Sequence, residues 1–156
     1  MNVERIYSRN IVRVPRSSTL RDAAILMRDY HVGALLVTED APNEDRVMGI
    51  VTDRDLVLQA MAEGIGPDDA TIGEVMTPDL VTIEGEADLH EAMETMRENG
   101  VRRLAVTADS GALVGVVSFD DVVDALAAEV GSLAGILKSE REFESAQFGN
   151  SALRVT

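Results

Sequence analysis

The sequence predicts an α/β fold in which two copies of one β-α-β-β-α unit pack about a pseudo-twofold axis. Residues 11–40 match residues 80–109 at ten of thirty positions when the chain is shifted by 69. The shift then becomes 66, and Gly49, Val51, Asp55 and Val57 recur 66 residues later. Apolar residues make up 46% of the chain, enough for a buried core. The chain is therefore an internal duplication.

Each copy is expected to open with a short apolar strand, at residues 11–14 and 80–83, followed by an amphipathic helix. Apolar residues recur at helical spacing in both copies: Leu20, Ala23, Ala24 and Met27, then Leu89, Ala92, Met93 and Met96. Thr19 and Asp88 are the expected N-caps of these helices. Asp22 and Glu91, three residues on, are the expected capping-box partners.

Two strands and a second helix close each copy. Continuous apolar runs at 34–37 and 104–106 predict strands buried on both faces, and residues 47–51 and 113–117 predict the next strands. The polar stretch EDAPNEDR (39–46) is expected to be a loop that absorbs the length difference between the copies. The closing helices are indicated by a second set of apolar residues: Leu56, Val57, Ala60 and Met61, then Val122, Val123, Leu126 and Ala127.

These elements divide the chain into a first repeat (6–63), a linker (64–72), a second repeat (73–130) and a C-terminal extension (131–156). A unit of about 60 residues buries only about 60% of its unfolded surface, so the copies are expected to pack face to face with matching clefts. Leu133, Ile136 and Leu137 predict a short docking helix in the extension. The end, SAQFGNSALRVT, is expected to be loosely ordered.

Composition excludes several classes of protein. Fourteen basic and 28 acidic side chains give a net charge of −14, which argues against binding nucleic acid or an anionic membrane. The absence of cysteine excludes disulfides, thiolate zinc sites and cysteine nucleophiles. No apolar segment resembles a signal peptide or a membrane span, so a cytoplasmic protein is expected. Thirteen of the fourteen cations are arginine, which with the acidity fits either a halophile or a GC-rich genome.

No catalytic or metal-binding constellation is visible in the sequence. His31 and His90 occupy non-equivalent places in the two copies and have no spaced partner residues, so surface roles at helix ends are expected. A glycine-rich phosphate loop is absent. We therefore expect a protein that is not an enzyme.

Two related segments, GIVTDRDL (49–56) and GVVSFDDV (115–122), carry the candidate chemistry. A strand that ends at Thr52 and turns into a helix places Thr52 at the N-cap and Asp55 in the first turn. An ionised carboxylate can accept from both hydroxyls of a ribose diol. Ser118 and Asp121 repeat the arrangement. The same spacing also forms a helix capping box, so a purely structural role is the alternative.

These segments, together with IGEVMTPDLVTI (72–83), resemble cystathionine-β-synthase (CBS) domains over about residues 6–130. The resemblance implies a tandem CBS pair, a Bateman-type module, whose clefts take adenosyl ligands: AMP, ADP, ATP, S-adenosylmethionine or NAD. It implies no required cofactor, and Mg²⁺ only alongside a polyphosphate. Carried over residue by residue, the Asp55 cleft comprises Ile50, Thr52, Asp55, Val81, Val101, Arg102 and Arg103. The Asp121 cleft comprises Val116, Ser118, Asp121, Val12, Val32, Gly33 and Ala34.

The two clefts differ in charge. Arg54 lies inside the first motif and has Asp120 as its counterpart, whereas Arg102 and Arg103 are matched by Gly33 and Ala34. Three cations are thus candidates for the Asp55 cleft, which is expected to bind an adenine nucleotide more tightly. The alternative is that Arg102 and Arg103 are solvated residues that pair with nearby carboxylates.

The resulting hypothesis is a stand-alone regulatory sensor that binds an adenosyl ligand and signals to an unidentified protein. The alternative is a ligand-free dimerisation or protein-interaction module with vestigial clefts. A homodimer is expected in either case, formed by apolar faces on the closing helices: Leu56, Val57 and Met61, with Val122, Val123 and Leu126.

Overall fold

The computed structural model describes residues 1–40 and 46–149. The centre of the predicted loop at 39–46 and the last seven residues of the predicted loose end lie outside the described residues. In chain order the elements are η1 (Val3–Arg5), β1 (Arg13–Pro15), α1 (Leu20–Tyr30), β2 (Ala34–Thr38), β3 (Val47–Thr52), α2 (Asp53–Asp55), the π-helical η2 (Leu56–Met61), α3 (Ile72–Val75), β4 (Thr77–Pro78), β5 (Thr82–Glu84), α4 (Leu89–Asn99), β6 (Arg103–Thr107), β7 (Leu113–Ser118) and α5 (Phe119–Gly149).

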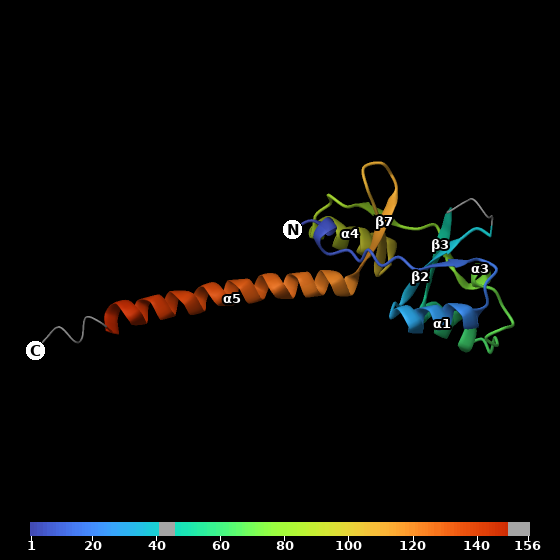
Figure 1. Cartoon of the computed structure of the whole chain (residues 1–156), viewed down its shortest axis with the longest axis horizontal. Coiled ribbons are helices and arrows are strands. Elements are labelled where there is room, and N and C mark those ends of the chain that lie inside the picture. The colour runs from blue at the N-terminus through green and yellow to red at the C-terminus, as the bar shows by residue number, and fades with distance from the viewer. Residues whose placement is uncertain (41–45, 150–156) are drawn as a thin grey trace, which may run out of the picture.

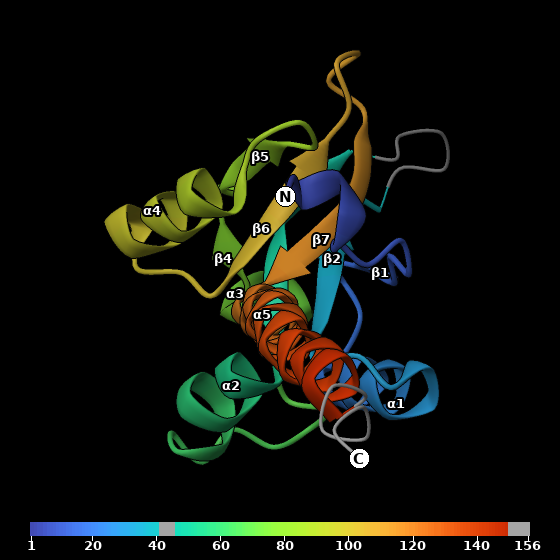
Figure 2. The same ribbon diagram turned by 90° about the vertical axis from the view of Figure 1, so that its left-hand side faces the viewer.

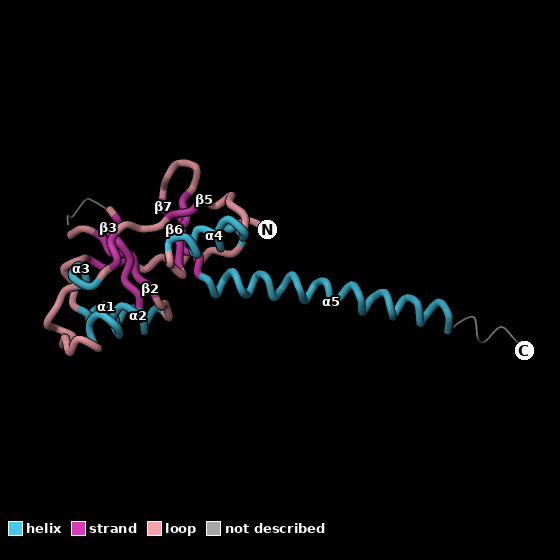
Figure 3. The backbone as a smooth tube through the Cα atoms, turned by 180° about the vertical axis from the view of Figure 1, so that it is seen from behind, coloured by secondary structure: helices cyan, strands magenta, loops and turns pink. Residues whose placement is uncertain are grey.

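The predicted α/β duplication is confirmed. One sheet has the order β1-β2-β3-β4 and the other β5-β6-β7. Figure 3 labels β2 and β3 of the first sheet and all three strands of the second. In each, the first strand runs parallel to the second, and the second pairs with the third as an antiparallel ladder. The opening strands begin two residues later than predicted, at Arg13 and Thr82. Corresponding elements of the two copies therefore have the same topology.

Each copy has its own apolar core between its sheet and its helices. Leu35, Val37 and Val51 are almost completely buried in the first core, and Leu104, Val106 and Val117 occupy the equivalent places in the second. The predicted capping box between Thr19 and Asp22 forms at the start of α1. At α4, Asp88 is the N-cap as predicted, and its side chain accepts a hydrogen bond from the backbone amide of Glu91 at 2.9 Å. The Glu91 side chain does not complete the predicted capping box.

The two copies exchange their opening segments. Val3 is fully buried in the core of the second copy, and Ile72, which lies 69 residues later, is fully buried in the core of the first. Strand β4 pairs with β3 of the first copy, while Ser8 pairs with Val116 of the second through two backbone hydrogen bonds of 2.9 and 3.0 Å. Each core is therefore completed by residues from the other half of the sequence.

Helix α3, which carries Ile72 into the first core, is held by a capping box. The amide and hydroxyl of Thr71 both donate to the Glu74 carboxylate, at 2.7 and 2.9 Å. These bonds, the amide bond first, hold the pKa of Glu74 below its ordinary value. Their stabilisation is present at neutral pH and is lost as the pH falls through the folded-state pKa.

The exchange explains the glycine that opens each motif. A Cβ on Gly49 would overlap the Thr77 carbonyl oxygen of β4, and a Cβ on Gly115 would overlap the Tyr7 ring and the Ser8 carbonyl oxygen. Only glycine allows the exchanged backbone to approach so closely. The motif glycines are therefore contact points between the copies.

The closing helices differ from the prediction. In the second copy, α5 continues unbroken from Phe119 to Gly149 and extends away from the body (Figure 1). The expected short docking helix is wrong, because Leu133, Ile136 and Leu137 lie within α5 and are 59–64% exposed. The expected place of Val122 on an exposed dimer face is also wrong, because Val122 is buried in the second core.

Substituting Gly115 tests the exchange of opening segments. Gly115→Ala should lower the free energy of unfolding by about 1–3 kcal/mol, because the new methyl group must displace Tyr7 and the Ser8 backbone. The measurement is urea unfolding followed by circular dichroism.

Gly131→Ala is the control. Gly131 lies inside α5, where an added Cβ would meet nothing within 4 Å beyond its own helix, so alanine there should raise stability slightly through helix propensity. Equal unfolding midpoints for Gly115→Ala and the unsubstituted chain would contradict the close approach.

Candidate functional site

Both T/S-x-x-D motifs form helix capping boxes at the end of a strand. The Asp55 carboxylate accepts from the amide and hydroxyl of Thr52, both at 2.9 Å. The Asp121 carboxylate accepts in the same way from Ser118, at 2.7 and 2.6 Å. The structural interpretation of the spacing is thus confirmed at both positions. It leaves open a second role, since a carboxylate has about four acceptor sites.

The two carboxylates differ in their remaining oxygen. In Asp55 the capping bonds use Oδ2, and Oδ1 accepts from the Gln59 side chain at 3.3 Å. The residue equivalent to Gln59 in the second copy is Ala125, which has no donor. Within the described residues, Oδ1 of Asp121 therefore has no hydrogen-bond partner. Oδ1 of Asp121 is therefore open to another molecule, whereas Oδ1 of Asp55 already accepts one long hydrogen bond from an exposed side chain.

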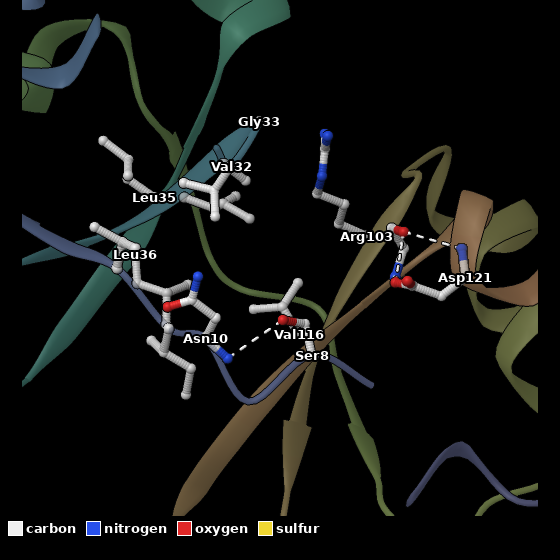
Figure 4. Close-up of a pocket in the computed structure, with 14 residues that line it drawn as sticks. Ser8, Asn10, Val32, Gly33, Leu35, Leu36, Arg103, Val116 and Asp121 are labelled. Carbon is white, nitrogen blue, oxygen red and sulfur yellow. Dashed lines mark hydrogen bonds between the residues drawn. The ribbon is translucent and has the colours of Figure 1, made fainter. Parts of the chain in front are cut away.

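Asp121 lies at a cavity of about 200 Å³ between the two copies (Figure 4). All seven residues expected for the Asp121 cleft line it: Val12, Val32, Gly33, Ala34, Val116, Ser118 and Asp121. The first-copy residues give the cavity an apolar wall opposite the carboxylate. Ligand binding by these residues remains a prediction.

Arg103 was expected beside Asp55, but it lines this cavity with Asp121 instead. The reason is strand register: Arg103 on β6 lies directly opposite Ser118 on β7. Its guanidinium extends toward the first copy, so that a Cβ on Gly33 would lie 2.9 Å from Nη2. Arg103 is the one cation among the fourteen residues that line the cavity. Ile50, also expected beside Asp55, lines the same space.

The other residues expected at the Asp55 cleft do not assemble into a cationic site. Arg102 is exposed, forms an ion pair with Asp120 at 3.5 Å and stacks on the Phe119 ring at 5.1 Å. Arg54 is exposed in a surface hollow with Asp53, Val57 and Leu58. Arg102 therefore matches the alternative expectation, that of a solvated residue that pairs with a nearby carboxylate.

Val81 and Val101, expected to face an adenine in the Asp55 cleft, pack against the core of the second copy instead. Both side chains are half-buried. The apolar wall described above comes from the first copy.

Five lining residues were not among the predicted site residues: Ser8, Asn10, Ile11, Leu35 and Leu36. Ser8 lies at the cavity because it pairs with Val116, and its hydroxyl accepts a hydrogen bond from the backbone amide of Asn10 at 3.2 Å (Figure 4). Ser8 and Asn10 could have been suspected from the repeat, because residues 8–10 align with residues 77–79 of the second opening segment. Their place at the site depends on the exchange between copies.

Neither histidine belongs to a site. His31 ends α1 in the left-handed conformation (φ 54°), as Gly100 ends α4 (φ 63°), and His90 lies exposed in the first turn of α4. The expected surface roles at helix ends are confirmed. In the described ranges, no three His, Cys, Asp or Glu residues cluster in a way that could hold a metal ion. None of the described helices combines the length and apolar character needed to cross a bilayer.

Comparison with known proteins gives matches over both copies. The sequence model of the CBS domain matches residues 3–61 and 72–128. Hypoxic response protein 1 from Mycobacterium tuberculosis is 34% identical over 117 residues, which cover 75% of this chain and 79% of that protein. An uncharacterized protein from Methanopyrus kandleri is 28% identical over 79% of this chain, and the match spans 61% of that longer protein.

Solved structures agree with the sequence matches. The crystal structure of a CBS-domain containing protein from Agrobacterium tumefaciens superposes with a TM-score of 0.70 at 28% identity, covering 80% of this chain and 97% of that one. The two family matches coincide with the duplicated units, and each contains one capped T/S-x-x-D motif. The chain belongs to the CBS domain family, as a tandem pair of CBS domains.

Proposed function

We propose that this CBS pair is a regulatory sensor that binds an adenosyl ligand in the cavity at Asp121 and passes the change to a partner protein. The observation that carries the proposal is that Asp121, whose Oδ1 takes no part in the capping bonds, lines an inter-copy cavity together with Arg103. Asp55 does not line this cavity, and its Oδ1 already accepts a hydrogen bond from Gln59 at 3.3 Å. The proposed site is therefore at Asp121, and not at Asp55 as the sequence favoured.

The lining chemistry fits a nucleoside. Asp121 offers an acceptor to vicinal ribose hydroxyls, and the apolar wall from Val12, Val32 and Ile50 offers packing for a purine ring. Arg103 offers a planar donor pair to a phosphate, in a chain whose net charge of −14 otherwise repels anions.

The cavity volume narrows the choice of ligand. Sites that enclose drug-sized ligands have volumes of about 300–1,000 Å³, and this cavity has about 200 Å³. It would enclose a base and sugar and leave further phosphates in solvent. The volume therefore matches the adenosine part that all the candidate ligands share, with their remaining groups outside the cavity.

A regulatory role follows from the position of the site between the copies. A ligand that touches both copies favours the arrangement in which its contacts are complete, and so shifts the population of relative positions. The curated relative named above as a hypoxic response protein has a name consistent with regulation.

A thermal-shift panel tests for binding. Adenosine, AMP, ADP, ATP, S-adenosylmethionine and NAD are each added at low and at high salt. A ligand present at 100 times its Kd stabilises the native state by about 2.7 kcal/mol, which is measured as a rise in Tm. If no member of the panel raises Tm at either salt concentration, the ligand-free interaction module is the function instead.

Asp121→Ala and Asp55→Ala form a matched pair for calorimetric titration with AMP. Both lose a capping box, so their losses of stability should be similar, at about 1 kcal/mol. Loss of charge-assisted hydrogen bonds to the sugar should weaken binding roughly 10- to 100-fold in Asp121→Ala. Asp55→Ala should bind AMP as the unsubstituted chain does. Unchanged affinity in Asp121→Ala would rule out the proposed site.

Arg103→Gln tests the phosphate contact separately from the sugar contact. This variant should weaken AMP and ATP several-fold and leave adenosine unchanged, because only the phosphorylated ligands offer the guanidinium an anionic partner. Arg54→Gln removes an exposed cation from the other motif and is the control. Equal losses for adenosine and AMP in Arg103→Gln would show that Arg103 shapes the cavity without contacting phosphate.

A further inference from the structure

Helix α5 leaves the body of the protein soon after it begins. It has 31 residues, a length of about 46 Å at 1.5 Å per residue, and runs outward from β7 (Figures 1 and 2). Val122 and Ala125 are buried against the second copy, but every residue from 126 to 147 is exposed. The described body therefore supports only the first two turns of this helix.

The exposed part carries a regular apolar stripe. Large apolar residues follow one another at alternating spacings of four and three, and all are 41–65% exposed: Phe119, Val123, Leu126, Val130, Leu133 and Leu137. We call these six residues the heptad stripe. A 3.5-residue period is typical of a helix that packs along another helix in a left-handed coil. A single helix packed on a sheet has no need of this period.

The opposite face of α5 is suited to water. It carries Asp124, Ser132 and Ser139, and an ion pair between Lys138 and Glu142 at 3.9 Å. Gly131 and Gly135 also lie in the helix interior, where each costs about 0.5–1 kcal/mol relative to alanine. Helix propensity alone is therefore a poor support for α5, and its stability requires packing of the stripe.

We propose that the heptad stripe pairs with the same stripe of a second copy of this chain, with the two α5 helices antiparallel. In the register that sets Val130 against Leu133 of the other copy, Leu126 faces Leu137, so these four stripe residues cover one another. Nearer the bodies, Val123 and Phe119 face Glu140 and Glu144 of the other copy. Asp120 and Arg141 occupy the flanking positions that meet in this register, so Arg141 of one copy would join the exposed ion pair that Asp120 of the other copy makes with Arg102. Charge complementarity thus favours a second copy as the occupant.

A parallel pair lacks this complementarity. Glu140 and Glu144 continue the heptad beyond Leu137, and in a parallel pair each would face its own copy across the interface, where like charges repel. The parallel arrangement would also place two bodies, each belonging to a chain of net charge −14, at the same end. The antiparallel arrangement separates the bodies and avoids both contacts.

Disulfide cross-linking tests the pairing and its direction, because the chain has no native cysteine. Leu126→Cys and Leu137→Cys are prepared in the full chain, oxidised separately and as a mixture, and analysed by non-reducing electrophoresis. The mixture should give a cross-linked dimer. Each variant alone should give little, because its two thiols are about 16 Å apart along the pair, well beyond the 4.4–6.8 Å between Cα atoms in a disulfide.

A mixture of Ser132→Cys and Ser139→Cys, on the opposite face of α5, is the control. Cross-linking of the Leu126→Cys and Leu137→Cys mixture no greater than in this control would overturn the proposal. Efficient cross-linking of each variant alone would overturn the antiparallel direction.

Sedimentation gives a second readout that needs no cysteine. Leu133→Glu places a charge in the stripe at an exposed position, so the body should fold unchanged. Its assembly should have half the mass of the unsubstituted protein's assembly, whereas Ser132→Glu should leave the mass unchanged. The same mass for Leu133→Glu and the unsubstituted protein would contradict pairing through α5. Neither experiment involves an adenosyl ligand, so its outcome is independent of the proposed function.

Discussion

The exchange of opening segments between the two copies is the constraint on which the rest of this structure depends. Each apolar core includes one fully buried residue from the opening segment of the other copy: Ile72 in the first core and Val3 in the second. Gly49 and Gly115 allow the exchanged backbone to cross the motif strands at contact distance. Because the same crossing brings Ser8 and Asn10 beside Val116, the packing that joins the copies also builds one wall of the cavity. Stability and site are therefore coupled through one interaction.

The duplication has given two sites with the same backbone and different side-chain chemistry. Both motifs cap their helices in the same way, but Gln59 occupies the remaining oxygen of Asp55, and Ala125 leaves that of Asp121 open. Arg103, opposite Ser118 in the ladder, adds a cation to the same side. A helix cap needs one acceptor oxygen, and a ligand needs another. The two carboxylates therefore differ in one hydrogen bond to the residue three positions after the motif segment, and only Asp121 lines the cavity.

Helix α5 contains both the candidate binding carboxylate and the heptad stripe. Its first turn contains Asp121, at the cavity, and its exposed length carries the heptad stripe. The equivalent helical segment of the first copy ends at Met61, after a π-helical turn. The second copy thus has both the open carboxylate and the long helix. The proposed ligand contact and the proposed self-association surface therefore lie on the same helix.

The sequence alone determined the duplication, the order of elements, the helix caps and the core residues, because these follow from local periodicity and from the comparison of one copy with the other. The family resemblance also assigned seven of the fourteen residues that line the cavity at Asp121. Tertiary structure decided what depends on contacts through space: the position of Arg103, the hydrogen bond from Gln59 to Asp55, the burial of Val122 and the exposure of Leu133. Apolar residues recur at the same helical spacing whether they are buried by their own chain, as Val122 is, or exposed, as Leu133 is. The physical reason is that periodicity specifies a face, and only packing specifies what lies against it.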